Sequence, residues 1–97
     1  MESNINQQHL SGEIYQLNSI KAYIFVQTQG GNLCQVLEDT KKLKHVTSAA
    51  VISGDYDIVV KVRVQTLNQL MKLTDKLQLI NGIQHTATHV VEREEFP

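Results

Sequence analysis

The chain has 97 residues, 41% of them hydrophobic and 20% charged, with a formal net charge of -1 at pH 7. This length predicts one domain near the lower limit for a self-sufficient core, so assembly into oligomers is expected. The charge balance argues against a protein that binds nucleic acid directly, because phosphate neutralisation needs a clustered excess of Lys and Arg.

Cysteine content and hydropathy exclude further classes. The single cysteine, Cys34, rules out a disulfide within the chain and any Cys-x-x-Cys motif. No apolar run reaches the ~20 residues that a membrane-spanning helix needs, and the polar start of the chain lacks the apolar core of a signal peptide. We therefore expect a cytoplasmic protein with no membrane partner.

Residues 1–20 are rich in Asn, Gln and Ser and predict a partly ordered N-terminal arm or one short helix. This segment is too short for a helix-turn-helix, which needs two packed helices and a turn. The domain itself is expected over residues 21–97. It opens at residues 21–28 with an apolar run of β-branched and aromatic residues, which is typical of a central strand.

A helix is predicted over residues 32–44, with Asn32 as N-cap, Gln35 three residues later and an apolar stripe behind them. Residues 46–53 predict a second strand, whose small side chains suit a sheet edge. Residues 58–64 alternate strictly, which places one face of this third strand in the core and Val59 on the other.

The second half repeats this plan. Thr66 and Gln69 form a capping box, and the helix that they start should reach residue 78 or 79. The Asn81-Gly82 pair ends it, residues 83–92 form the last strand, and a charged tail follows. The order βαββαβ predicts an α+β, ferredoxin-like domain, with a four-stranded antiparallel sheet, both helices on one face and the first and third strands in the centre.

Such a sheet has an open face, which is the face away from the helices. Aromatic or aliphatic residues of the first strand must point to it, and this would expose more apolar surface than a monomer usually shows. A two-fold dimer with packing of the dimeric α/β-barrel type would cover the open face, and the N-terminal arm is the alternative cover. The pairs that could point outward are Tyr23 with Phe25, or Ile24 with Val26.

Three motifs together suggest a family: Gly54-Asp55-Tyr56-Asp57, then Asn81-Gly82-Ile83, then Thr86-x-Thr88. In this order and spacing they resemble the effector-binding (RAM) domain of the Lrp/AsnC regulators, from residue 21 to about residue 93, in a stand-alone form without a helix-turn-helix. The resemblance implies dimers that assemble into rings, commonly octameric, with a small amino acid bound between dimers. It also implies an Lrp-like regulator as a possible partner.

An amino-acid site needs a carboxylate for the ammonium group and N–H or hydroxyl donors for the carboxylate of the ligand. Asp55 or Asp57 could bind the ammonium, and threonine hydroxyls from a neighbouring subunit could complete the site. The structural alternative is that Asp57 caps the turn, the tyrosine packs at an interface and the threonines are ordinary strand residues. The candidate ligand-binding residues are Gly54, Asp55, Tyr56, Asp57, Thr86 and Thr88.

Two other classes are open. A small dimeric oxygenase or isomerase would fit the fold, but the sequence has no cofactor fingerprint and no nucleophile paired with a base. An ACT-type sensor would use a Gly-rich turn after the first strand, where Gly30 and Gly31 stand. His85 and His89 lie on one strand about 13 Å apart, too far to share one ion. We therefore expect no enzyme, no cofactor and no metal.

Overall fold

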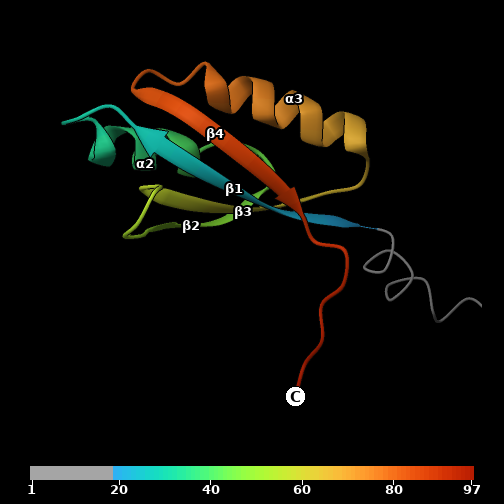
Figure 1. Cartoon of the computed structure of the whole chain (residues 1–97). Coiled ribbons are helices and arrows are strands. Elements are labelled where there is room, and N and C mark those ends of the chain that lie inside the picture. Colours follow the sequence, from blue (N-terminus) through green and yellow to red (C-terminus); the bar gives the residue numbers. More distant parts are fainter. Residues whose placement is uncertain (1–18) are drawn as a thin grey trace, which may run out of the picture.

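The structure is a computed structural model, and it describes residues 19–97. The predicted N-terminal arm lies almost entirely outside the described residues. Four strands form one antiparallel sheet in the order β2-β3-β1-β4, with both helices on one face (Figure 1). The α+β, ferredoxin-like prediction is therefore confirmed. The elements are β1 (Ile20–Thr28), α2 (Leu33–Lys41), β2 (Val46–Val51), β3 (Ile58–Val64), α3 (Leu67–Gln78) and β4 (Ile83–Val90).

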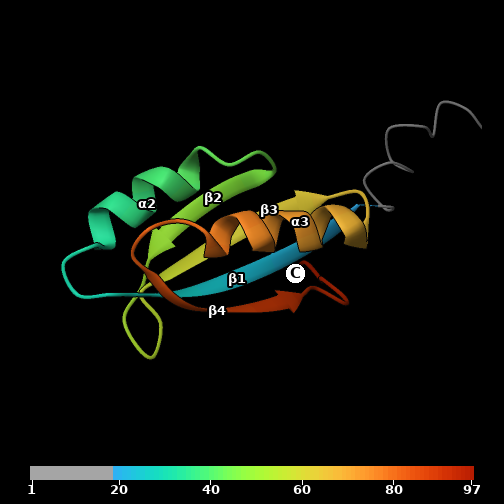
Figure 2. The ribbon, with the colours of Figure 1, turned by 90° about the horizontal axis from the view of Figure 1, so that it is seen from above.

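The core lies between the sheet and the helices, and alternate residues of the two central strands supply most of it. Three alternate side chains of β1 and four of β3 are at most 2% exposed, as the alternation in the sequence predicted for β3. Seen from above, α2 lies beside β2 and α3 crosses above the other strands (Figure 2). The buried strand residues are Ala22, Ile24, Val26, Ile58, Val60, Val62 and Val64.

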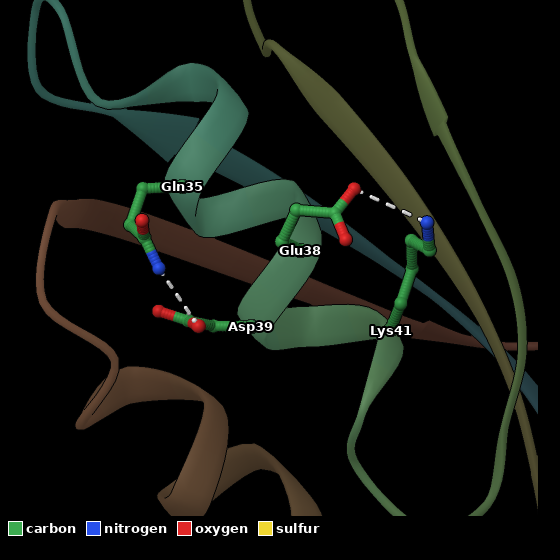
Figure 3. Close-up of polar contacts among 4 residues, drawn as sticks. All are labelled: Gln35, Glu38, Asp39 and Lys41. Atoms are coloured by element: carbon green, nitrogen blue, oxygen red, sulfur yellow. Dashed lines mark hydrogen bonds and ion pairs between the residues drawn. The ribbon is translucent and has the colours of Figure 1, made fainter.

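The start of α2 differs from the prediction. Asn32 is the N-cap, but its side chain makes no capping hydrogen bond, because its backbone (φ -109°, ψ 6°) lacks the extended geometry of most capping residues. Gln35 instead donates a hydrogen bond from Nε2 to Asp39 Oδ1 at 3.0 Å (Figure 3). The helix ends at Lys41, three residues earlier than expected, before His45 takes a left-handed φ of 76°.

The capping box of α3 is confirmed. Thr66 Oγ1 accepts a hydrogen bond from the Gln69 backbone N–H at 3.1 Å. The return bond is shifted by one residue, since Gln69 Oε1 accepts from the backbone N–H of Gln65 at 2.8 Å. After α3, Gly82 has φ 99°, and a Cβ built there would lie 2.8 Å from Asn32 Cβ. Glycine is therefore required where the end of α3 meets the start of α2.

Strand register decides which side chains of β1 reach the open face. Phe25 lies between Val59 of β3 and Ala87 of β4, and Tyr23 lies between Lys61 and His89. Both aromatic residues are half-buried, while Ile24 and Val26 point to the helices. No helix covers the open face in the part of the chain that is described (Figure 1). The predicted open face, with Val59 on it, therefore exists.

Candidate functional site

The connection between β2 and β3, residues 52–57, is a closed turn at one end of the sheet. The Ile52 backbone N–H donates to the carbonyl oxygen of Asp57 at 2.8 Å, which closes the turn and ends β2 two residues earlier than predicted. The Asp57 N–H donates to the carbonyl oxygen of Val26 in β1 at 2.9 Å. Gly54 has φ 135°, a conformation that favours glycine. We call this connection the 52–57 turn.

The carboxylate of Asp57 fixes the 52–57 turn to the end of β1. Its Oδ2 atom accepts from the backbone N–H of Thr28 at 2.8 Å and from Thr28 Oγ1 at 3.1 Å. A carboxylate has about four acceptor positions, so the other oxygen keeps capacity for a cation. Asp57 therefore has the structural role that the sequence offered as an alternative, and it retains room for a ligand role beside it.

Asp55 lies at the exposed tip of the same turn. Its backbone oxygen accepts a long hydrogen bond, 3.4 Å, from Gln27 Nε2. Its carboxylate has no hydrogen bond or ion pair with any of residues 19–97. Of the two candidate acidic residues, Asp55 thus offers the carboxylate that the fold itself does not use.

The ring of Tyr56 packs against aromatic side chains of the open face. The ring centroid lies 5.7 Å from that of Phe25 and 6.2 Å from that of His85, with the second pair stacked at 21°. The Phe25 ring also meets His89 edge-on at 5.5 Å. These spacings are those of favourable aromatic pairs. The candidate turn and the open face are consequently one continuous surface.

Thr86 and Thr88 lie on the side of the sheet opposite to the open face. They pair in register with Val26 and Ile24, whose side chains point into the core, so the two threonines also face the helices. Thr86 Oγ1 accepts a hydrogen bond from Gln78 Nε2 of α3 at 3.1 Å. Within one chain, β1 stands between these hydroxyls and the 52–57 turn. One chain therefore brings the four candidate residues of the turn together, but it does not bring Thr86 and Thr88 to them.

Chemically, the 52–57 turn supplies acceptors for an ammonium group, and the threonine pair supplies donors for a carboxylate. Three contacts of the turn were not foreseen: Thr28 binds Asp57, and Phe25 and His85 flank Tyr56. Sequence patterns show which residues of a strand share a face, but not the register that sets these neighbours. Within residues 19–97, no three His, Cys, Asp or Glu side chains are grouped to hold a metal ion.

A cluster of three cations lies at the other end of the open face. Lys21 and Arg63 face each other across β1 and β3, and Lys61 extends over the Tyr23 ring at 5.7 Å. The charged tail returns to this cluster, where Glu94 binds Lys21 through an ion pair. The hydrogen bond from Lys21, strengthened by the nearby positive charges, lowers the pKa of Glu94 below its ordinary value. The tail of the chain thus supplies a carboxylate that pairs with this cation cluster.

Comparison with known proteins identifies the domain. The family model described as the Lrp/AsnC ligand binding domain matches residues 21–96. The chain belongs to the Lrp/AsnC family. The regulator FL11 of Pyrococcus horikoshii is 30% identical over 73 residues, which are 75% of this chain and 48% of FL11. The chain therefore spans about half the length of this curated relative.

Solved structures agree with this assignment. The protein FFRP-DM1 is 33% identical, with a TM-score of 0.70 over 74% of this chain and 97% of that one. Escherichia coli AsnC, at 22% identity, has the same fold with a TM-score of 0.78 over 100% of this chain and 64% of AsnC. No helix within the described residues is long and apolar enough to cross a membrane. The resemblance predicted from the three motifs is confirmed at the level of the family.

Proposed function

We propose that this Lrp/AsnC domain senses a free amino acid, which binds between copies of the chain and alters their assembly. The change in assembly passes to an Lrp-like regulator, and no covalent bond is made or broken. The family assignment over residues 21–96 supports a regulatory role. A Neisseria meningitidis regulator with this fold, 15% identical to the chain, was solved as a complex with L-methionine, which supports an amino acid as the ligand class.

The observation that carries this proposal is the placement of the candidate residues on opposite faces of the sheet. Asp55 and Asp57 lie on the 52–57 turn, which continues the open face, while Thr86 and Thr88 face the helices. A site that uses all four side chains therefore needs two copies. A ligand that touches both copies favours the assembled state, which is the condition for coupling between binding and assembly.

The open face supports a dimer as the unit of this assembly. Tyr23, Phe25 and Val59 are half-buried there, and no helix of residues 19–97 covers them. A second copy stacked on this face would bury them, and their aromatic surface is of the kind enriched at interfaces. Rings of such dimers, the partner regulator and a cytoplasmic location stay predictions.

A thermal-shift screen of the twenty amino acids tests the proposal. A ligand at ~100 times its Kd adds ~2.7 kcal/mol to the free energy of unfolding. For a domain of this size, this raises Tm by about 10 °C or more. Asp55→Ala should abolish most of the shift without lowering the Tm of the free protein, since the Asp55 carboxylate has no partner within residues 19–97. Asp75→Ala, at an exposed position of α3, is the matched control.

The possible results test the sensor function and the location of its binding site separately. If no amino acid shifts Tm, the sensor proposal is wrong. If an amino acid shifts Tm equally in the wild type, Asp55→Ala and Asp57→Ala, the protein is a sensor but its site is not at the 52–57 turn. Light scattering that gives 11.0 kDa, the mass of one chain, with and without the ligand would contradict a site shared between copies.

A further inference from the structure

A hollow lies on the helix side of the molecule, away from the 52–57 turn. It lies between the end of α2 and the middle of α3 and has a volume of about 320 Å³. Leu43 and Leu73 contribute apolar surface, and Leu73 is only 5% exposed. The other lining residues are Lys42, Lys44, His45, Gln69, Lys72 and Lys76, so four lysines meet there. We call this site the lysine hollow.

The lysine hollow concentrates positive charge without an answering acid. No Asp or Glu lines it, and none of its four lysines makes an ion pair or hydrogen bond through its side chain with any described residue. Lys72 and Lys76 stand at i and i+4 of α3, where like charges are destabilising. Lys41, one residue before the hollow, is by contrast paired with Glu38 at 3.2 Å (Figure 3).

The open face gives a comparison within the same chain. Its cluster of Lys21, Lys61 and Arg63 receives a carboxylate from Glu94 of the tail. The lysine hollow has one more cation than that cluster, but no carboxylate of the described residues pairs with its lysines. The formal net charge of -1 means that the chain has slightly more acidic than basic residues. The difference between the two clusters therefore points to an anion that comes from outside the described part of the chain.

Helix dipoles account for only part of the arrangement. Lys42 follows the last residue of α2, and Lys76 lies in the last turn of α3, where a cation is favoured. Lys72 lies a full turn earlier and gains little from the dipole, which acts within the last turn. Lys72 lies beside Lys42 and Lys44, so lysines from two separate segments meet in the hollow. The helix dipole does not explain this meeting.

We propose that the lysine hollow binds a compact polyphosphate anion, a small molecule with two or more phosphate groups. Each phosphate carries up to two negative charges and three strong acceptor oxygens, which suits lysines that act as mobile point charges. The volume is that of a site for a small molecule. The lysines converge on one hollow instead of lining a stripe, and the net charge of the chain is negative, so an extended nucleic acid fits less well.

Titration of the 97-residue chain with inorganic tripolyphosphate tests this proposal. At low salt, calorimetry should show one tripolyphosphate per chain, bound more tightly than monophosphate. Binding should weaken as NaCl is added, because exposed charges are screened. The double variant Lys72→Gln/Lys76→Gln should bind at least about tenfold more weakly, since it loses two charge-assisted hydrogen bonds. Lys41→Gln, outside the hollow, should bind as the wild type does.

Three results would overturn the proposal. One is the absence of heat and of any Tm shift with tripolyphosphate in the wild type at low salt. The second is equal affinity of the double variant and Lys41→Gln, which would indicate general attraction to surface charge. The third is tighter binding of a short DNA duplex than of tripolyphosphate at equal phosphate concentration. None of these depends on the amino-acid site, because all are measured without an amino acid and with the 52–57 turn intact.

Discussion

The two faces of the sheet are built from the same strands but serve different ends. On β1, alternate residues such as Ile24 point to the helices and are fully buried, while Tyr23 and Phe25 point to the open face and stay half-buried. The buried helix-facing residues of β1 and β3 are all aliphatic. The open face carries aromatic rings, two histidines and a cation cluster, and it runs into the 52–57 turn.

From this difference we expect the helix side to supply most of the stability and the open face to supply self-association. A folded chain gains most from close-packed aliphatic side chains, and the helix side of the sheet supplies them. Aromatic and charged groups that stay half-exposed add little to one chain, but they give affinity and specificity when a second surface covers them. Ile24 and Phe25 are sequence neighbours on opposite faces, so they form a matched pair with which to test this division.

The largest effect is expected at the helix-facing side. Ile24→Ala removes a fully buried side chain from the centre of the core and should lower the free energy of unfolding by about 2–5 kcal/mol. Chemical denaturation at fixed protein concentration measures this loss. A decrease below about 1 kcal/mol would show that the core is less tightly packed than the burial of Ile24 indicates.

A different property should change at Phe25. Phe25→Ala removes the ring that contacts both Tyr56 and His89 on the open face, so it should weaken self-association by about 2 kcal/mol or more, as is typical of a central aromatic residue of an interface. Sedimentation equilibrium over a range of concentrations measures the dissociation constant. Identical constants for Phe25→Ala and the wild type would place the interface elsewhere.

The 52–57 turn continues the open face, and its two acids should respond differently to substitution. Asp57→Ala leaves the backbone N–H of Thr28 without its acceptor, which should lower the free energy of unfolding by about 1–3 kcal/mol. Asp57→Asn keeps an acceptor oxygen and should lose less. Asp55→Ala should stay within about 0.5 kcal/mol of the wild type, as do most surface substitutions. Equal losses for Asp55→Ala and Asp57→Ala in denaturation experiments would contradict the structural role given to Asp57.

Local patterns predicted most of the fold because its elements are locally encoded. The alternation of β3, the capping box of α3 and the break at Gly82 each depend on residues close in sequence. The prediction for Asn32 was wrong in its capping bond, since that residue packs against Gly82, far along the chain. The position and length of an element could thus be predicted, whereas the contacts between elements could not.

The candidate site was predictable in composition but not in geometry. The turn chemistry of Gly54 and Asp57 is visible in the sequence, and the structure confirms a closed turn there. The side of the sheet on which Thr86 and Thr88 lie depends on the register between β1 and β4, which no local pattern specifies. Their contribution from a neighbouring copy therefore stays a prediction, to be tested by the ligand screen.

The smallest effect is expected where the tail meets the open face. Because Lys21 lowers the pKa of Glu94 in the folded chain, this ion pair stabilises the docked tail above the pKa of the unfolded glutamate and is lost as pH falls through the lower, folded value. Exchange of the Val91 amide hydrogen, which is bonded to the Lys21 carbonyl, should then quicken in acid beyond its intrinsic pH dependence. Glu94→Gln should remove this transition, and Glu95→Gln should keep it. The same acid transition in both variants would show that another group holds the tail.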